Sequence, residues 1–382
     1  MNKIKVMTVF GTRPEAIKMA PLVHALQKSD TLESIVCVTA QHREMLDQVL
    51  DIFDIKPDYD LNIMQPRQTL ALITEKSLHG LDEVLEQAQP DIVLVHGDTS
   101  TTFAGALAAF YHKIPVGHVE AGLRTYDKYS PFPEEMNRKL VGQIASLHFA
   151  PTVRNRDNLA REDIAQGVSI CGNTVVDAIH MTVKNDFAFR DEQLKALDFA
   201  NNRVVLVTAH RRENYGEAME NICRAIAELS AAYPDVHFVY PVHLSPYVRE
   251  TAEKFLGGNE RIHLIHPLAV DEMHNLMARC YLIMTDSGGL QEEAPSLGKP
   301  VLVLRRETER PEAIEAGTVK LAGVDRETIV SLARELFDDP AAYAAMAHAV
   351  NPYGDGKACE RILQAIEHFF GLRDDGPAPF QP

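Results

Sequence analysis

The sequence contains few of the features that mark secreted or membrane-inserted proteins. Only five of its 382 residues are cysteines, and no two of them form the CxxC pair of a zinc ribbon. An odd number of scattered cysteines predicts reduced, mostly buried thiols rather than a disulfide framework. No apolar run reaches the length of a membrane-spanning helix, and the N-terminus lacks the cleavage site of a signal peptide. We therefore expect a cytoplasmic protein with no membrane partner.

Positive charge is scarce as well. Lysine and arginine together number 38 against 54 aspartates and glutamates, which gives a formal net charge of −16. Such a chain repels a phosphate backbone, so we expect no nucleic-acid partner. A small anionic ligand is still compatible with this charge, because a few local cations or a helix N-terminus can hold one.

Several nucleotide and nucleophile motifs are missing too. The sequence has neither GxxxxGK[ST] nor GxGxxG, which disfavours an ATPase P-loop and a dinucleotide site. It has no GxSxG, and no cysteine lies in a candidate loop beside a base. The 16 histidines show no spacing typical of a metal site. We expect neither a metal nor a cofactor.

What the sequence does contain is a regular alternation of strands and helices. Apolar, β-rich runs at 3–10, 91–96 and 115–119 alternate with helical patterns, and a second such series starts near Arg203. This alternation predicts an α/β protein made of two doubly wound domains with a cleft between them. We expect the domains at 1–172 and 173–358, with a last helix at about 359–370 packing back on the first domain.

Ionisable residues gather directly after the predicted strands, where open α/β sheets bind their ligands. Three acids are candidates for proton transfer: Asp98, Glu120 and Glu134. Asp98 could instead cap a helix, and Glu134 could be a first-turn carboxylate that the helix dipole favours. The residues alone do not separate Glu134 from Glu135.

Cations and glycines occupy the same kind of position. His210 ends a predicted strand, and Arg13 and Lys18 lie at the start of the first helix, where they could neutralise a diphosphate. For Lys18 alone, a solvated helix end is the better reading. The segment Ser287-Gly288-Gly289 could cradle a phosphate, with Glu293 on a ribose, although a plain glycine turn with a serine cap is equally compatible.

Several blocks together resemble one enzyme family over nearly the whole chain. They are FGTRPEAIKMAPLV at 10–23, TAQHREMLDQVL at 39–50, VLVHGDT at 93–99, GHVEAGLRT at 117–125, TAHRREN at 208–214, TDSGGLQEEAPSLGKPVLVLR at 285–305, TERPEAIEAGT at 308–318 and NPYGDGKA at 351–358. The chain resembles the bacterial non-hydrolysing UDP-N-acetylglucosamine 2-epimerases.

This resemblance implies a GT-B-like fold of two Rossmann-type domains and an isomerase that needs no cofactor. The reaction would interconvert UDP-N-acetylglucosamine and UDP-N-acetylmannosamine, with UDP as a bound intermediate product, and would supply cell-surface polysaccharide synthesis. Loss of the C2 proton and of UDP would give 2-acetamidoglucal, and UDP would then add back. The catalytic residues implied are Asp98, Glu120, Glu134 and His210, and which acid removes the proton is left open.

The resemblance also assigns binding residues. Those for the substrate are Arg13, Lys18, Leu268, Met273, Ser287, Gly288, Gly289, Glu293 and Arg310. A second UDP-N-acetylglucosamine would activate the enzyme at an allosteric site made of Gln41, Glu44, Arg67, Glu134, Arg211 and His243. Glu44 departs from the glutamine of the clearest members, and Met273 stands where some members carry an aromatic residue. A homodimer is also implied.

Three other functions share parts of this pattern. A GT-B glycosyltransferase would use the same nucleotide site but needs an acceptor groove and usually one base. A hydrolysing epimerase would release UDP and free N-acetylmannosamine. A nucleotide-sugar sensor would bind UDP without exchanging a carbon-bound proton.

Overall fold

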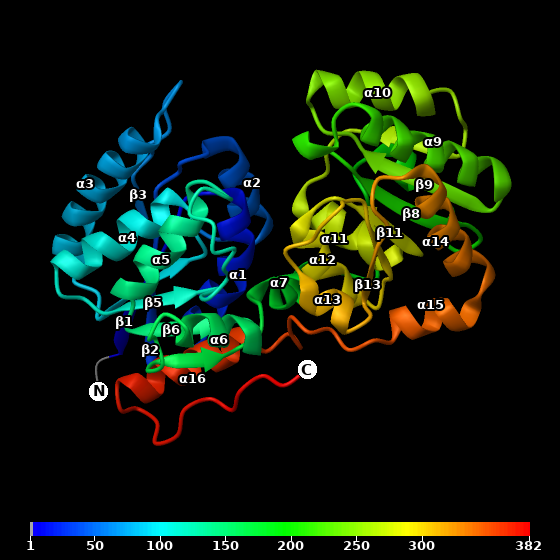
Figure 1. The fold of residues 1–382 in the computed structure, drawn as a ribbon. Coiled ribbons are helices and arrows are strands. Elements are labelled where there is room, and N and C mark those ends of the chain that lie inside the picture. The colour runs from blue at the N-terminus through cyan, green and yellow to red at the C-terminus, as the bar shows by residue number, and fades with distance from the viewer. Residues whose placement is uncertain (1–2) are drawn as a thin grey trace. The chain divides into compact units, whose positions relative to one another are not determined.

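The computed structural model describes residues 3–382 and divides the chain into two compact units. Unit 1 comprises the chain up to Met181 together with Tyr353–Pro382, and unit 2 is Thr182–Pro352. The first crossing lies inside helix α7 (Thr174–Thr182), later than the predicted boundary at residue 172, and the chain returns before residue 358. Helix α16 (Ala358–Phe369, red in Figure 1) belongs to unit 1 and packs on α1.

Unit 1 is built on a parallel seven-stranded sheet with the order β3-β2-β1-β4-β5-β6-β7. Besides α7 and α16, its elements are β1 (Ile4–Phe10), α1 (Arg13–Gln27), β2 (Leu32–Val38), α2 (Arg43–Ile52), β3 (Tyr59–Asp60), α3 (Leu70–Ala88), β4 (Ile92–His96), α4 (Ser100–Tyr111), β5 (Val116–Val119), α5 (Glu134–Ile144), β6 (Leu147–Ala150), α6 (Val153–Ala160) and β7 (Val168–Ile170). The order reverses between β1 and β4, and ligands of such sheets bind at this switch point.

Unit 2 repeats the plan with six parallel strands in the order β10-β9-β8-β11-β12-β13. Its elements are α8 (Glu192–Ala196), β8 (Arg203–Thr208), η1 (Arg212–Asn214), α9 (Glu217–Ala232), β9 (Val236–Pro241), α10 (Pro246–Leu256), β10 (Ile262–Ile265), α11 (Val270–Arg279), β11 (Leu282–Thr285), α12 (Gly288–Glu293), η2 (Ala294–Leu297), β12 (Val301–Val303), α13 (Pro311–Glu315), β13 (Val319–Leu321), α14 (Arg326–Asp338) and α15 (Pro340–Ala347). Here the switch point lies between β8 and β11.

Burial explains why these strands pair in parallel. All five residues of β4 are buried, and Val205, Leu206 and Val207 in β8 are fully covered. Strands that are apolar on both faces need helices on both sides of the sheet, which is what the crossover helices provide (Figure 1). The two α/β halves predicted from the alternation are therefore observed.

The beginning of α1 shows how local sequence sets an element. Thr12 precedes the helix, and its side chain and the N3 residue Glu15 form a capping box. Pro14 lies in the first turn, as predicted, where its missing N–H costs nothing. These residues hold the loop after β1 in place at the switch point of unit 1.

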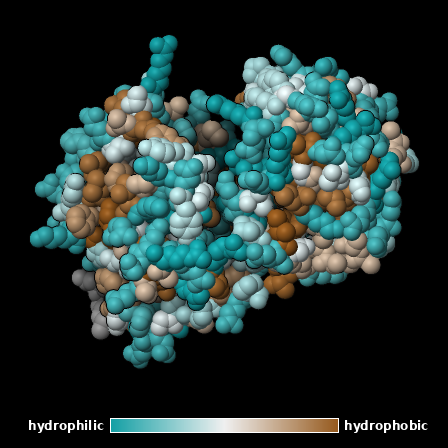
Figure 2. Space-filling model, in the orientation of Figure 1, coloured by the Kyte–Doolittle hydropathy of each residue, from teal (hydrophilic) through white to brown (hydrophobic). Residues whose placement is uncertain are grey.

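Large apolar side chains also reach the surface of unit 1. Phe110 and Tyr111 at the end of α4 are 59% and 62% exposed, and Leu140 on the neighbouring α5 is 40% exposed. Figure 2 shows hydrophobic residues gathered over α4. We call these three residues the α4–α5 patch.

All five cysteines carry free, buried thiols. None of the helices formed by residues 3–382 combines the length and the apolar character that crossing a membrane requires.

Candidate active site

Glu120 follows β5 and is held by two donors on one oxygen. Its Oε2 accepts a hydrogen bond from Lys18 Nζ at 2.5 Å and lies 2.9 Å from Nε2 of His96, the last residue of β4. Burial alone would raise the pKa of this carboxyl, but the Lys18 charge and the His96 hydrogen bond outweigh it and lower the pKa well below its usual range. Within residues 3–382, the other oxygen, Oε1, has no hydrogen bond. Glu120 is an ionised carboxylate with one oxygen free.

Asp98 shows the same arrangement at the end of β4. Its Oδ2 accepts from Arg138 Nε at 2.9 Å, and Arg138 Nη2 lies 2.7 Å from the same oxygen. It does not cap the next helix, because the side chain of Thr99 accepts from Thr102 N and caps α4 instead. The alternative role of Asp98 as a helix cap is therefore not what the structure shows.

The structure separates Glu134 from Glu135. Glu135 is fully buried and accepts from the backbone N–H groups of Thr125 and Tyr126, each at 3.0 Å, and from Arg138 at 3.2 Å. It is a structural carboxylate that fixes the loop before α5. Glu134 opens α5, and its buried Oε2 has no hydrogen-bond partner within residues 3–382. Of the two, Glu134 is the acid whose carboxylate does not hold the surrounding loop.

A buried histidine forms a hydrogen bond to the turn that precedes Asp98. His118 on β5 lies with Nε2 2.7 Å from the carbonyl oxygen of Gly97, whose φ of 66° makes the turn that a glycine allows. Burial lowers the pKa of His118 to about 3, so this ring is neutral and donates from Nε2. His118 therefore positions the residue before Asp98.

The other residues predicted in unit 1 are more loosely placed. Arg13 is the first residue of α1 and is half-buried. Gln41 accepts from Thr101 Oγ1 at 3.2 Å, whereas Glu44 and Arg67 are exposed. No hydrogen bond within residues 3–382 joins Gln41, Glu44 and Arg67 to one another.

In unit 2, the loop after β8 is organised by Asp286. This carboxylate is fully buried after β11, and its Oδ2 accepts from the backbone N–H groups of His210 and Arg211, each at 2.7 Å. Asn214 Nδ2 donates to the same oxygen at 3.2 Å. His210 is 39% exposed, and its Nδ1 lies 3.4 Å from Asp286 Oδ1. Burial, His243 and Arg211 lower the pKa of His210 against the opposing effect of Asp286.

Two further cationic side chains approach the loop that was predicted to hold a phosphate. A Cβ placed on Gly288 would lie 3.7 Å from Arg310 Nη2 and 3.9 Å from Arg211 Nη2. The imidazole of His243 stacks on that of His210, with 5.2 Å between centroids and 8° between planes. Ser287 precedes α12 without a side-chain capping bond, so the simple serine cap is not what this segment forms.

The nucleotide-facing residues predicted in unit 2 have their own partners. Glu293 lies with Oε2 3.6 Å from His274 Nε2, and Arg310 pairs with the buried Glu292. Leu268 is buried, and Met273 is half-buried on α11. A Cβ added to Gly289 would lie only 3.2 Å from Glu293 Oε1, so the glycine allows the Glu293 carboxylate to approach the backbone closely.

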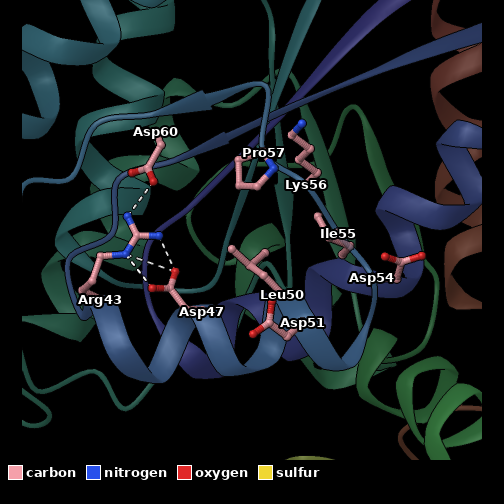
Figure 3. Close-up of a pocket in the computed structure, with 9 residues that line it drawn as sticks. All are labelled: Arg43, Asp47, Leu50, Asp51, Asp54, Ile55, Lys56, Pro57 and Asp60. Carbon is pink, nitrogen blue, oxygen red and sulfur yellow. Dashed lines mark hydrogen bonds and ion pairs between the residues drawn. The ribbon is translucent and has the colours of Figure 1, made fainter.

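The cavity in Figure 3 is not a phosphate site. It has a volume of about 510 Å³ and lies beside α2. Its lining contains four aspartates but only two cations, Arg43 and Lys56. Arg43 is already paired with Asp47 and with Asp60, so little positive charge is left for an anion. None of the predicted site residues lines this cavity.

Comparison with known proteins decides the family. The family model for UDP-N-acetylglucosamine 2-epimerase matches residues 24–367. The chain is 58% identical over 382 residues to the UDP-N-acetylglucosamine 2-epimerase of Bacillus subtilis, a match that covers 100% of this chain and 99% of the relative. The chain belongs to the UDP-N-acetylglucosamine 2-epimerase family. The predicted family and the predicted enzyme class, an isomerase, are confirmed.

Solved structures agree with this assignment. A crystal structure of a UDP-N-acetylglucosamine 2-epimerase matches with a TM-score of 0.92 and 56% identity, covering 100% of each chain. A 2-epimerase of Methanocaldococcus jannaschii, solved in complex with UDP-GlcNAc and UDP, matches with a TM-score of 0.77 and 35% identity over 96% of this chain and 100% of that one. The predicted α/β, GT-B-like class of the epimerase family is likewise confirmed.

Sequence reasoning missed the residues that hold the candidate acids and His210. They are His96 and Arg138 in unit 1 and Asp286 in unit 2. Glu135, the alternative to Glu134, has a structural role that the sequence does not predict. His96 and Asp286 stand inside the motifs quoted above, at the ends of β4 and β11, and that position was a usable signal. Arg138 and Glu135 lie on a helix, and no local pattern distinguishes them from surface charges.

Proposed function

We propose that this chain interconverts UDP-N-acetylglucosamine and UDP-N-acetylmannosamine without hydrolysing them. A carboxylate takes the proton from C2, the C–H electron pair forms the C1–C2 double bond, and the C1–O bond breaks as UDP leaves. UDP then adds back to 2-acetamidoglucal after a proton returns to the other face of C2. The observation that carries this proposal is Glu120, which is held by Lys18 and His96 on one oxygen and has the other available. The product would supply cell-surface polysaccharide synthesis.

The three acids suit different proton-transfer roles. Arg138 on Asp98 and Lys18 on Glu120 each contact one carboxylate oxygen, so the second oxygen of each acid can accept a proton. Glu134 has a buried oxygen without a hydrogen-bond partner, so this oxygen can exchange a proton with a bound substrate. We therefore propose Asp98 or Glu120 as the base in a given direction and Glu134 as a proton donor.

The cations of unit 2 would stabilise the leaving diphosphate. Arg211 and Arg310 both approach Gly288, and His210 lies on the adjoining loop. Guanidinium groups match phosphate oxygens in geometry and charge. Ser287, Gly288 and Gly289 would hold the diphosphate, Glu293 the ribose, and Leu268 and Met273 the uracil, while Arg13 and Lys18 complete the set of substrate cations in unit 1.

We further propose activation by a second UDP-N-acetylglucosamine that contacts Gln41, Glu44, Arg67, Glu134, Arg211 and His243. The archaeal relative solved with both UDP-GlcNAc and UDP supports two ligands in one enzyme of this family. A rate curve that rises sigmoidally with substrate concentration is expected. A strictly hyperbolic curve would remove this part of the proposal.

A homodimer is proposed as well. The α4–α5 patch exposes two aromatic side chains and a leucine, and a second copy would remove this apolar surface from water. Sedimentation should give twice the chain mass, and Phe110→Ser should shift the species towards the monomer. A wild-type monomer at micromolar concentration would contradict the proposal.

Proton NMR in heavy water tests the reaction. We expect UDP-N-acetylmannosamine to accumulate from UDP-N-acetylglucosamine, with deuterium incorporated at C2. UDP and a free sugar would favour the hydrolysing enzyme instead. Binding without exchange would favour a glycosyltransferase or a sensor, and the acid roles would then be wrong.

A further inference from the structure

One oxygen of the Asp286 carboxylate accepts several hydrogen bonds, and the other accepts none from the described residues. Three donors converge on Oδ2, namely two backbone N–H groups and the Asn214 amide. Oδ1 is buried and has no hydrogen-bond partner within residues 3–382, but it lies 3.4 Å from His210 Nδ1. A buried carboxylate oxygen without a donor is costly, and a small rotation of the imidazole would satisfy it.

Two neighbouring side chains restrain the His210 ring. Asp286 faces its Nδ1 from the loop after β11, His243 covers one face from the loop after β9, and Arg211 follows it in the chain. The side chain is still 39% exposed, so a ligand can reach the rest of the ring. These are the titratable and charged groups that act on His210.

We propose that His210 takes up a proton when a diphosphate binds, with Asp286 as the buried positioning residue that makes the imidazolium stable. This inference rests on the proposed function, because it takes UDP as the ligand. The proton comes from solvent and forms the second N–H bond of the ring. Nδ1–H then donates to Asp286 Oδ1, and Nε2–H donates to a phosphate oxygen. The imidazolium lies between two anions, which is the charge pattern that stabilises it.

The free protein is poised for this uptake. Burial lowers the pKa of His210 below its ordinary value, with His243 and Arg211 acting in the same direction. At neutral pH the ring is therefore neutral before the ligand arrives, and a proton can be gained. A neutral ring with its proton on Nδ1 could not donate from Nε2, so the second proton is what allows His210 to bind the anion.

Calorimetry of UDP binding in buffers of different ionisation enthalpy tests the proposal. At about pH 7.5, above the ordinary histidine pKa of about 6.5, the wild type should take up a large fraction of one proton. His210→Gln should take up none. Asp286→Asn should take up much less and bind UDP roughly tenfold more weakly, the loss of one charge-assisted hydrogen bond. Asn214→Ala is the matched control, because it removes a donor to Asp286 Oδ2 but keeps the Oδ1–Nδ1 pair; it should retain the uptake.

A second measurement does not need Asp286→Asn to fold. Nitrogen NMR of the wild type, with the His210 signals identified by their absence in His210→Gln, should change from a neutral to a doubly protonated ring when UDP is added. UDP binding with no proton uptake and a neutral ring would overturn the inference and leave the proposed function intact. Equal uptake by wild type and Asp286→Asn would overturn the role of Asp286. A wild type that does not bind UDP would remove both proposals.

Discussion

The two units use opposite charges in opposite roles. In unit 1 the proposed reactive groups are carboxylates, and cations hold them: Lys18 on Glu120, and Arg138 on Asp98. In unit 2 the proposed ligand-facing groups are basic side chains, and buried carboxylates hold them: Asp286 next to His210, and Glu292 against Arg310. Each half thus pairs a carboxylate with a basic side chain at the switch point of its sheet, and we propose that the carboxylate acts on the substrate in unit 1 and the basic side chain in unit 2.

This difference predicts which kinetic step each unit controls. A carboxylate that moves a proton acts only in the transition state, so its loss lowers kcat. A cation that binds a diphosphate acts on the bound nucleotide as well, so its loss weakens UDP binding. Substitutions of the acids in unit 1 should therefore lower kcat, and substitutions of the basic side chains in unit 2 should lower UDP affinity.

Glu120→Gln gives the largest expected effect. The amide keeps the shape but cannot accept the proton, so kcat should fall by about a thousandfold, while UDP affinity changes by less than about threefold. Steady-state rates and UDP calorimetry check both values. A variant with normal kcat, or one that loses UDP binding to the same degree, would break the assignment of proton transfer to unit 1.

Neighbouring glutamates on α5 should behave in different ways. Glu134→Gln should lower kcat about a hundredfold and leave the melting temperature unchanged, because its carboxyl carries no structural hydrogen bond. Glu135→Gln should instead lower the free energy of unfolding by about 2 kcal/mol, since a buried acceptor of two backbone N–H groups is weakened. Rates and denaturant unfolding of the pair distinguish these outcomes, and equal behaviour of the two would contradict the structural role of Glu135.

Much of this could be predicted from the sequence because the signals were local. The strand runs at 91–96 and 203–208 are continuous and β-branched, and the acid or histidine after each run follows from the sheet rule. The partners could not be predicted in the same way. Arg138 reaches Asp98 across 40 positions, and Asp286 reaches His210 across 76. Such pairs depend on how strands and helices pack, and no spacing in the sequence records that.

Buried histidines in unit 1 should make its stability depend on pH. Burial lowers the pKa of His118 to about 3, and of His148 to about 4. The unfolded chain binds these protons near pH 6.5 and the folded chain does not, so the stabilising contribution is complete above that pH and is lost as pH falls. As the pH falls from about 6.5 to 5, proton binding by each of these histidines in the unfolded chain should lower the free energy of unfolding by about 2 kcal/mol.

His118→Gln isolates this contribution. The glutamine amide can still donate to the Gly97 carbonyl oxygen, but it does not titrate. Urea unfolding at several pH values should show a shallower loss of stability than in the wild type, by about one proton in the slope. If the unfolding free energies of the two proteins changed equally with pH, His118 would not be a buried neutral ring. The hydrogen bond that we assign from His118 to Gly97, next to Asp98, would then be wrong.

Gly288→Ala gives the smallest effect and tests unit 2 without removing any charge. The atoms nearest to the added Cβ are Arg310 Nη2 at 3.7 Å, Arg310 Cζ at 3.8 Å and Arg211 Nη2 at 3.9 Å, which are ordinary contacts, and Gly288 does not have a positive φ. The fold should therefore accept alanine with no loss of stability. If a diphosphate occupies the space between the two guanidinium groups, the methyl group intrudes on it, and UDP affinity should fall about tenfold, near 1.4 kcal/mol.

Calorimetry with UDP measures this, with thermal unfolding as the control. Unchanged affinity would move the diphosphate away from Gly288, and the contrast between a proton-transfer unit and an anion-binding unit would then rest on His210 alone.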